Sequence, residues 1–152
     1  MHQRLKIASL AALFGIASLV TPAGAAGLFS ATGTVIAILD GELFLGQAEG
    51  HLDGAGTLNI HAQKNPALVC SGAFTSSAAM GGTGQLACSD GATSAFHFQR
   101  LSVFRGHGIG SFSRGAMSFV YGLSNEEARP YLELPPGKKL MHNGIELAMV
   151  DL

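Results

Sequence analysis

Residues 82–98 read GTGQLACSDGATSAFHF, and this stretch decides the predicted fold. The three residues at its centre, 89–91 (Ser-Asp-Gly), suit a hairpin loop in which a type I turn is followed by a glycine in the left-handed region. The register set by that loop pairs glycines with aromatic residues, namely Gly84 with Phe96 and Gly82 with Phe98. An aromatic ring over a cross-strand glycine covers backbone that the glycine leaves exposed. The glycines therefore have a structural role that needs no ligand.

The rest of the chain repeats this order of short alternating segments and turns. Asp40-Gly41, between two apolar segments, is a strong hairpin signal, and Asp53-Gly54 follows it. The segments GAGTLNIH, GTGQLACS and GIGSFS share the order G-x-G-x-apolar, which we interpret as an internal repeat of one hairpin unit. Turns recur about every ten residues, which is typical of an all-β protein. We expect roughly eight to ten strands in an antiparallel meander that forms a small barrel or sandwich.

A second hairpin with glycines opposite aromatic residues is expected in residues 105–122. If Arg114 and Gly115 form a two-residue loop, the strands on either side acquire a defined register. The predicted pairs are Gly110 with Phe119 and Gly108 with Tyr121.

The chain changes character near its C-terminus. Ser124 and Glu127 have the spacing of a capping box that starts a helix, and a proline three residues later ends the run early. The sequence predicts one short helix within residues 124–133, followed in residues 134–152 by a turn and a last hairpin about an Asn-Gly pair. We expect this tail to cover an open end of the sheet.

Residues 1–25 have the order of a secretory signal peptide. Basic residues at positions 4 and 6 precede an apolar run at 7–20, and Ala-Gly-Ala follows at 23–25. The apolar run is shorter than the about 20 residues that a transmembrane helix needs. We expect cleavage, location in the periplasm or secretion, and no transmembrane segment after cleavage, with an uncleaved anchor as the alternative. Residues 26–152 then form a single β-rich domain.

The charge balance argues against nucleic acid as a partner. The full sequence has 9 Lys and Arg against 10 Asp and Glu, and cleavage would remove Arg4 and Lys6 from the basic side. Binding to phosphates needs clustered basic residues, and Lys138-Lys139 is the one such pair in the remaining sequence. We therefore expect no nucleic-acid binding.

Cys70 and Cys88 are the two cysteines of the chain. In an oxidising compartment such a pair is most simply a disulfide. If the two residues lie on consecutive antiparallel strands, the bridge closes a loop of about 18 residues, which contributes roughly 3 kcal/mol in the chain-entropy treatment. A metal-binding or redox-active pair of thiols is the alternative, but the C-x-x-C spacing is missing.

Histidines supply the candidate metal ligands, because imidazole is the commonest nitrogen ligand in proteins. Five histidines follow the predicted signal peptide: His51, His61, His97, His107 and His142. They form neither H-x-H nor H-E-x-x-H, and scattered histidines are more often surface residues. We take His97 and His107 as candidate metal ligands and expect no resident cofactor. Four methionines could join histidines around copper, although core packing is the simpler interpretation: Met80, Met117, Met141 and Met149.

No set of residues has the spacing of a known catalytic motif. The glycine-rich segments lack the spacing of nucleotide-binding loops. Ser111 and Ser113 lie near His107, but on a predicted hairpin rather than on the strand-to-helix elbow of a serine nucleophile. Four carboxylates could converge for glycoside chemistry, although the last two already suit turns: Glu42, Glu49, Asp53 and Asp90. We therefore assign no catalytic residue.

The aromatic residues could fill one core or line one small-ligand cavity in a closed eight-stranded barrel. They are Phe29, Phe44, Phe74, Phe96, Phe98, Phe104, Phe112, Phe119 and Tyr121. In a domain of this size a filled core is the simpler interpretation.

The order GxGxLxCSDG, followed by a strand of alternating aromatic residues and by GxGxGxF, resembles small exported proteins of Gram-negative bacteria. The resemblance covers residues 46–122. It implies an envelope location and a disulfide-linked β-fold, and it carries no catalytic residues. The predicted function is an exported, non-catalytic accessory or binding protein of the cell envelope, with an envelope protein as a partner. A small-ligand or metal-binding β-barrel is the first alternative, and a periplasmic hydrolase is the second.

Overall fold

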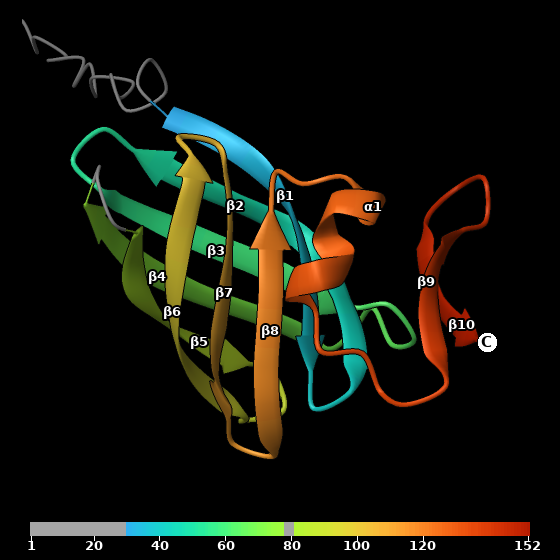
Figure 1. Cartoon of the computed structure of the whole chain (residues 1–152). Coiled ribbons are helices and arrows are strands. Elements are labelled where there is room, and N and C mark those ends of the chain that lie inside the picture. The colour runs from blue at the N-terminus through green and yellow to red at the C-terminus, as the bar shows by residue number, and fades with distance from the viewer. Residues whose placement is uncertain (1–29, 78–80) are drawn as a thin grey trace, which may run out of the picture.

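Eight antiparallel strands, each paired with its neighbours along the chain, close into a barrel in the computed structural model (Figure 1). The structure describes residues 30–77 and 81–152. The barrel strands are β1 (Ser30–Leu39), β2 (Glu42–His51), β3 (Ala55–Ala62), β4 (Val69–Ser77), β5 (Gly81–Cys88), β6 (Thr93–Ser102), β7 (Arg105–Phe112) and β8 (Gly115–Tyr121). Pairing of β8 with β1 closes the barrel. The predicted all-β antiparallel meander is confirmed, and it is a barrel rather than a sandwich.

The predicted signal peptide, residues 1–25, lies outside the described residues, as do Phe29 and Met80. Within the described part of the chain, no helix is long and apolar enough to cross a membrane. Export therefore stays a prediction.

Two of the turns are those that the sequence predicts. Between β1 and β2, Asp40 (φ 50°) and Gly41 (φ 78°) both lie in the left-handed region, as a type I′ turn requires. Between β5 and β6, Gly91 has a φ of 88°, and the Cys88 amide donates to the Ala92 carbonyl over 2.8 Å. The Asp-Gly hairpin and the three-residue loop are confirmed.

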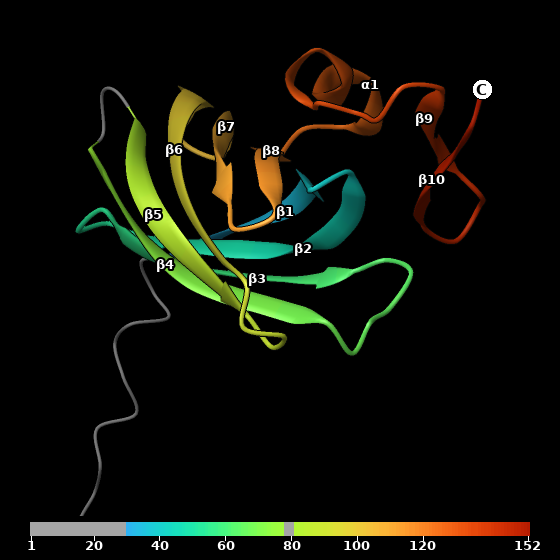
Figure 2. The same cartoon turned by 90° about the horizontal axis from the view of Figure 1, so that it is seen from below.

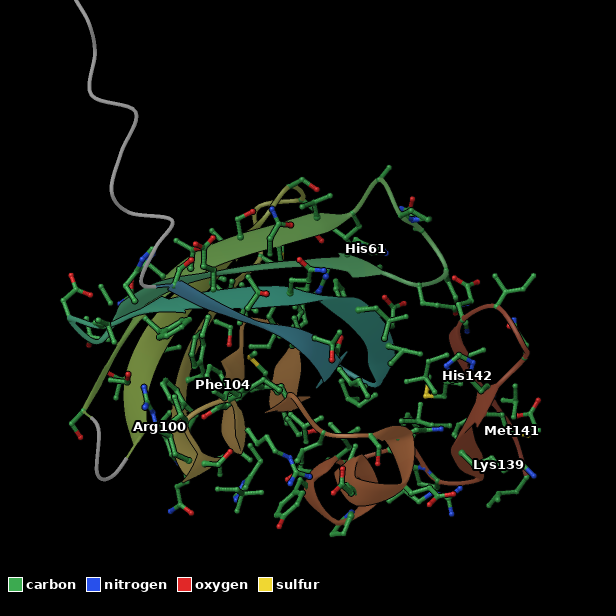
Figure 3. The ribbon with its side chains drawn as sticks, turned by 90° about the horizontal axis from the view of Figure 1, so that it is seen from above. His61, Arg100, Phe104, Lys139, Met141 and His142 are labelled. Carbon is green, nitrogen blue, oxygen red and sulfur yellow. A yellow bond between two sulfur atoms is a disulfide. The ribbon has the colours of Figure 1, made fainter. Side chains whose placement is uncertain are left out.

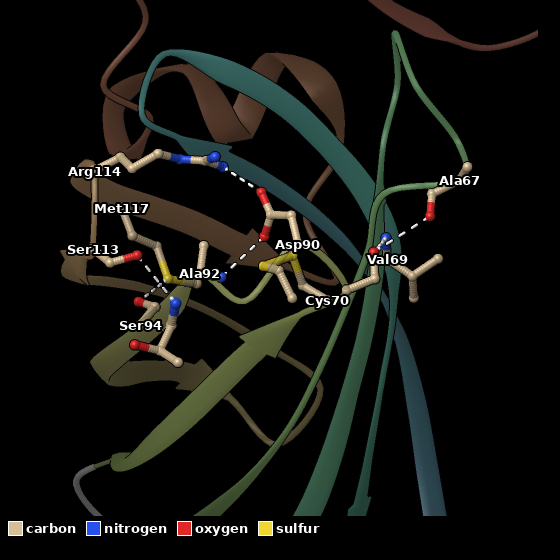
Figure 4. Close-up of a disulfide and its surroundings, with 12 residues drawn as sticks. Ala67, Val69, Cys70, Asp90, Ala92, Ser94, Ser113, Arg114 and Met117 are labelled. Atoms are coloured by element: carbon tan, nitrogen blue, oxygen red, sulfur yellow. Dashed lines mark hydrogen bonds and ion pairs between the residues drawn. A yellow bond between two sulfur atoms is a disulfide. The ribbon is translucent and has the colours of Figure 1, made fainter.

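The disulfide and the register of the central hairpin are also confirmed. Cys70 and Cys88 are directly opposite one another in the β4–β5 ladder and form the disulfide (Figure 4). The β5–β6 ladder has the predicted pairs, Gly84 with Phe96 and Gly82 with Phe98.

The predicted register of β7 and β8 is wrong by two residues. Ser113 and Arg114 form the turn, and Gly115 already pairs with Phe112. The observed pairs are Gly108 with Phe119 and Gly106 with Tyr121. Gly115 is not part of the turn. It leaves room for the side chain of Asp40, because a Cβ at position 115 would lie 2.5 Å from a carboxylate oxygen of Asp40.

Alternation along each strand separates an inward from an outward set of side chains. In β6, Phe96 and Phe98 are buried, whereas His97 and Gln99 are exposed. The inward set forms one apolar cluster that includes the disulfide. The inner face of β6 is therefore apolar here, and its outer face is polar.

The C-terminal tail packs on the outer surface of the barrel (Figure 2). Its elements are α1 (Asn125–Ala128), the 3₁₀ turn η2 (Arg129–Tyr131), and the hairpin of β9 (Lys138–His142) and β10 (Leu147–Asp151). The predicted short helix and last hairpin are confirmed. A second apolar cluster joins Ile38 and Val120 of the barrel to Leu140 of the tail. The prediction that the tail covers an open end of the sheet is wrong, because β1, β2 and β8 present an apolar outer stripe that the tail buries.

Polar contacts hold the start of the tail. The predicted capping box is present: the Glu127 carboxylate accepts from the Ser124 amide over 3.0 Å, and Ser124 Oγ accepts from the Glu127 amide over 3.3 Å. Arg105 of β7 donates to the Glu127 carboxylate. The hydrogen bond from the Ser124 amide, together with Arg105, lowers the pKa of Glu127 to about 2. Further along, Ser118 Oγ accepts from the Glu133 amide over 2.8 Å.

Candidate functional site

One half of the barrel interior is filled. The disulfide lies there with Met117, whose sulfur accepts from the buried Ser94 hydroxyl over 3.1 Å (Figure 4). The β5–β6 loop closes this end, where Arg114 lies 2.9 Å from an Asp90 carboxylate oxygen. The pKa of Asp90 is lowered, first because the Ala92 amide donates to its carboxylate and then because of Arg114. This half therefore acts as the core of the protein.

The other half of the interior holds a cavity of about 640 Å³. Small-molecule sites in proteins occupy about 300–1,000 Å³. Val35, Leu58 and Phe119 lie at its inner end, and residues of the β2–β3 and β6–β7 turns lie at its mouth. The cavity is therefore large enough for one small ligand.

Aromatic rings form much of the cavity wall. Phe98 makes edge-to-face contacts with Phe74 at 5.5 Å and with Tyr121 at 5.9 Å between ring centroids. Deeper in the barrel, Phe96 and Phe119 are in edge-to-face contact at 5.2 Å. Such pairs stabilise one another beyond the burial of their area, so they fix the shape of the wall.

Inward-facing glycines explain why these rings leave the axis of the barrel open. Each ring lies across a glycine of a neighbouring strand, so that an added Cβ would collide with it: Phe74 across Gly56, Phe96 across Gly84, Tyr121 across Gly106 and Phe119 across Gly108. Because a glycine has no side chain, each ring occupies space next to the backbone that a larger residue would fill. Three of these glycines, Gly56, Gly84 and Gly108, belong to the repeated G-x-G order of the sequence, which thus contributes to the open space.

Arg100, at the end of β6, is the one lysine or arginine among the described residues that line the cavity. Its Nη2 donates to Ser76 Oγ over 2.6 Å, and that hydroxyl donates to the Gly54 carbonyl over 3.3 Å. Arg100 Nε and Tyr121 Oη are buried and have no hydrogen-bond partner among the described residues. Burial raises the pKa of Tyr121, and the charge of Arg100 opposes part of that rise. The cavity therefore has one charged, polar corner in an apolar surround.

The mouth of the cavity carries exposed apolar side chains. Leu52 of the β2–β3 turn is 81% exposed, and Val103 and Phe104 of the β6–β7 turn are 66% and 57% exposed. Figure 3 shows Arg100 and Phe104 at the same end of the barrel, away from the β9–β10 hairpin. Phe104 is thus a residue of the mouth and not the core residue that we expected. The reason is that Phe104 lies in the turn between Ser102, the last residue of β6, and Arg105, the first residue of β7.

The candidate metal ligands lie on the outer wall of the barrel. His97 is exposed on β6, and His107 on β7 stacks on the ring of Tyr131 at 4.1 Å between ring centroids. Over residues 30–77 and 81–152, no three His, Cys, Asp or Glu side chains come together as a metal site would require. The structure brings neither histidine to the cavity. Of the methionines, Met117 is a core residue, and Met141 is exposed.

The residues considered for catalysis are also apart from the cavity or occupied in turns. Ser111 is exposed on the outer wall, and Ser113 Oγ accepts from the Thr93 amide over 3.2 Å. The Asp53 carboxylate accepts from the Ala55 amide over 2.9 Å, and Asp90 has the contacts described above. Asp53 lies at the mouth of the cavity and holds the β2–β3 turn, as the sequence predicts.

Arg100 is the charged cavity residue that the sequence analysis missed. The signal was available: the alternation that places Phe96 and Phe98 inward continues to Arg100, two residues further on. The sequence predicted that Tyr121 pairs with Gly108, whereas it pairs with Gly106, the partner of Arg100. The position of Tyr121 next to Arg100 therefore did not follow from the predicted register.

No family model, no curated protein and no solved structure matches this chain. The resemblance to small exported proteins of Gram-negative bacteria therefore stays a prediction, and the function is argued from the cavity.

Proposed function

We propose that this protein binds a small, largely apolar molecule in the open half of the barrel. The observation that carries the proposal is the cavity of about 640 Å³ with aromatic walls and an apolar mouth. Mostly apolar walls with a few placed polar groups are typical of small-molecule sites.

The proposed binding takes place outside the cytoplasm. The signal peptide predicted for residues 1–25 supports this location, and so does the Cys70–Cys88 disulfide, because disulfides persist in oxidising compartments. An envelope accessory role, with a protein partner, stays a prediction beside this proposal. The cavity favours ligand binding over it.

The test is titration of the purified protein with N-phenyl-1-naphthylamine, a neutral apolar dye that fluoresces when shielded from water. We expect saturable binding of one dye per chain. Ala48 lies on the cavity wall, so Ala48→Phe fills the space and is expected to abolish the saturable signal. Gln47, the preceding residue, is exposed, so Gln47→Phe adds the same ring outside and is the matched control.

Thermal unfolding of each variant shows whether it is folded. If Ala48→Phe does not fold, Ala31→Phe tests the same cavity nearer its mouth. Wild-type binding by a folded Ala48→Phe variant, or no saturable binding by the wild type, would contradict the proposal. Native mass spectrometry of the protein from its own host is an independent readout, since a bound molecule adds a mass that is lost on denaturation.

A further inference from the structure

Three neighbouring strands place the polar groups of the cavity in one row. Arg100 of β6 pairs with Gly106 of β7, and Gly106 pairs with Tyr121 of β8. A Cβ at Gly106 would collide with the hydroxyl and the ring of Tyr121. The glycine therefore allows the Tyr121 side chain to lie across β7, on the side of Arg100.

The guanidinium of Arg100 is held by one hydrogen bond and has another donor without an acceptor among the described residues. Ser76 accepts one hydrogen bond from Nη2, while Nε is buried and has no partner among the described residues. The ion pairs of the described chain do not include Arg100. A buried donor without an acceptor is costly, and a native structure that retains one commonly has a ligand or water as the partner.

The Tyr121 hydroxyl is the second unused group. It is buried and has no hydrogen-bond partner in the described part of the chain. Burial raises the pKa of Tyr121, so the phenol is protonated at neutral pH and can donate. Arg100 and Tyr121, which both line the cavity, thus each have one buried donor without an acceptor among the described residues.

We propose that the cavity binds an amphipathic monocarboxylate, whose carboxylate accepts from Arg100 and from Tyr121 while its apolar chain extends along the aromatic wall. This inference rests on the proposed function. A guanidinium matches the two oxygens of a carboxylate in its planar geometry, and hydrogen bonds to charged groups are stronger than neutral ones.

The charge of the corner favours a monoanion over a dianion. Arg100 is the one lysine or arginine among the described cavity residues, and the carboxylate of Asp53 lies at the mouth of the same cavity. A second negative charge on the head group would therefore find no second lysine or arginine among the described cavity residues and would be repelled by Asp53. A phosphate monoester fits the corner less well than a carboxylate.

The position of the corner gives the orientation of the ligand. Arg100 is near the mouth, and Phe96 lies deeper, four residues back and about 13 Å along β6 at the usual rise of a strand. The chain of a medium-length fatty acid would contact Phe98, Phe96 and Leu58 in turn.

The experiment measures displacement of N-phenyl-1-naphthylamine from the full, disulfide-bonded protein by decanoate and by decan-1-ol. These ligands have the same chain and differ in the head group. We expect decanoate to bind about tenfold more tightly or better, the size of a hydrogen-bonded charged contact. Arg100→Met removes the charge at similar length and is expected to abolish this preference. Tyr121→Phe is expected to weaken decanoate severalfold and to leave decan-1-ol within about twofold.

Arg114→Met is the matched control, because Arg114 pairs with Asp90 at the opposite, filled end of the barrel; the preference for decanoate should persist. If Arg100→Met does not fold, Tyr121→Phe keeps the test decisive. Equal affinity for both ligands in the wild type would overturn the head-group inference and leave the proposed function standing. Tighter binding of decyl phosphate than of decanoate would also overturn it. Failure of the dye and of both ligands to bind would instead overturn the proposed function.

Discussion

The ring of Phe119 lies across Gly108, its partner in the β7–β8 ladder. A Cβ at position 108 would meet both this ring and the backbone carbonyl of His97. The same relationship recurs between Phe96 and Gly84. Inward-facing glycines of the barrel therefore leave room for aromatic rings of neighbouring strands, and the cavity depends on these glycines.

Gly108→Ala is expected to destabilise the protein by about 1–3 kcal/mol, because overpacking forces side chains and backbone to move. Gly50→Ala is the matched control, since its Cβ would lie 3.9 Å from the Phe74 ring and its φ is not in the left-handed region. Urea unfolding of both variants measures the difference. A Gly108→Ala variant as stable as Gly50→Ala would contradict the inference that Gly108 leaves room for the Phe119 ring.

Removal of the disulfide by Cys70→Ala with Cys88→Ala is expected to lower the free energy of unfolding by roughly 3 kcal/mol. The bridge joins residues 18 apart in the sequence and lies in the filled half of the barrel. Dye binding in the other half should survive, at a temperature where the variant is folded. Urea unfolding without reductant checks the first expectation. A loss well below about 1 kcal/mol would show that the bridge adds little to this barrel.

Much of the fold follows from local signals in the sequence. Asp40-Gly41 and residues 89–91 form the turns that their residue types predict, since few residues adopt a positive φ without strain. The β5–β6 register follows from the loop at 89–91, and the pairing of Cys70 with Cys88 is the one expected if the two residues lie on consecutive antiparallel strands.

The missed features depend on contacts between distant segments. Gly115 looks like a turn glycine, but it leaves room for the carboxylate of Asp40, 75 residues earlier, so the β7–β8 turn lies one residue nearer the N-terminus than predicted. The cavity was an alternative in the sequence analysis, where a filled core was the simpler interpretation. Alternation predicts which aromatic residues face inward, and the predicted register already placed the Phe96 ring over Gly84, but neither signal shows whether the space between the rings is filled.

Leu140→Ala in the tail is expected to cost about 2–5 kcal/mol, because Leu140 is 1% exposed against the outer wall of the barrel. Met141→Ala, on the exposed face of the same strand, is the matched control and should stay within about 0.5 kcal/mol of the wild type. Urea unfolding compares the two variants. If Leu140→Ala behaves like Met141→Ala, the tail does not contribute to the stability of the barrel.

Glu127→Gln is expected to lower the melting temperature at neutral pH by weakening the contacts with the Ser124 amide and with Arg105. The folded pKa of Glu127, about 2, is below its ordinary value of 4.5. The stabilisation is therefore complete above about pH 4.5 and is lost as the pH falls toward 2. Melting curves at several pH values should show the wild type and the variant converging over this range. A difference that is the same at pH 7 and at pH 2 would contradict the assignment.

Tyr121 should produce the opposite dependence at high pH. Burial raises its pKa above the ordinary value of 10.0, so the folded protein retains a proton that the unfolded chain releases. The stabilisation is complete below about pH 10 and is lost as the pH rises through the folded pKa. We expect the urea midpoint to fall more steeply above pH 10 in the wild type than in Tyr121→Phe. Tyr131 is present in both proteins, so the difference in phenolate absorbance between them isolates Tyr121.

Because a carboxylate bound at the corner accepts from the neutral phenol, decanoate should raise the pKa of Tyr121 further in the wild type. The same titration with and without decanoate thus reports on the head-group contact directly, and an unchanged curve at saturating decanoate would place the carboxylate elsewhere.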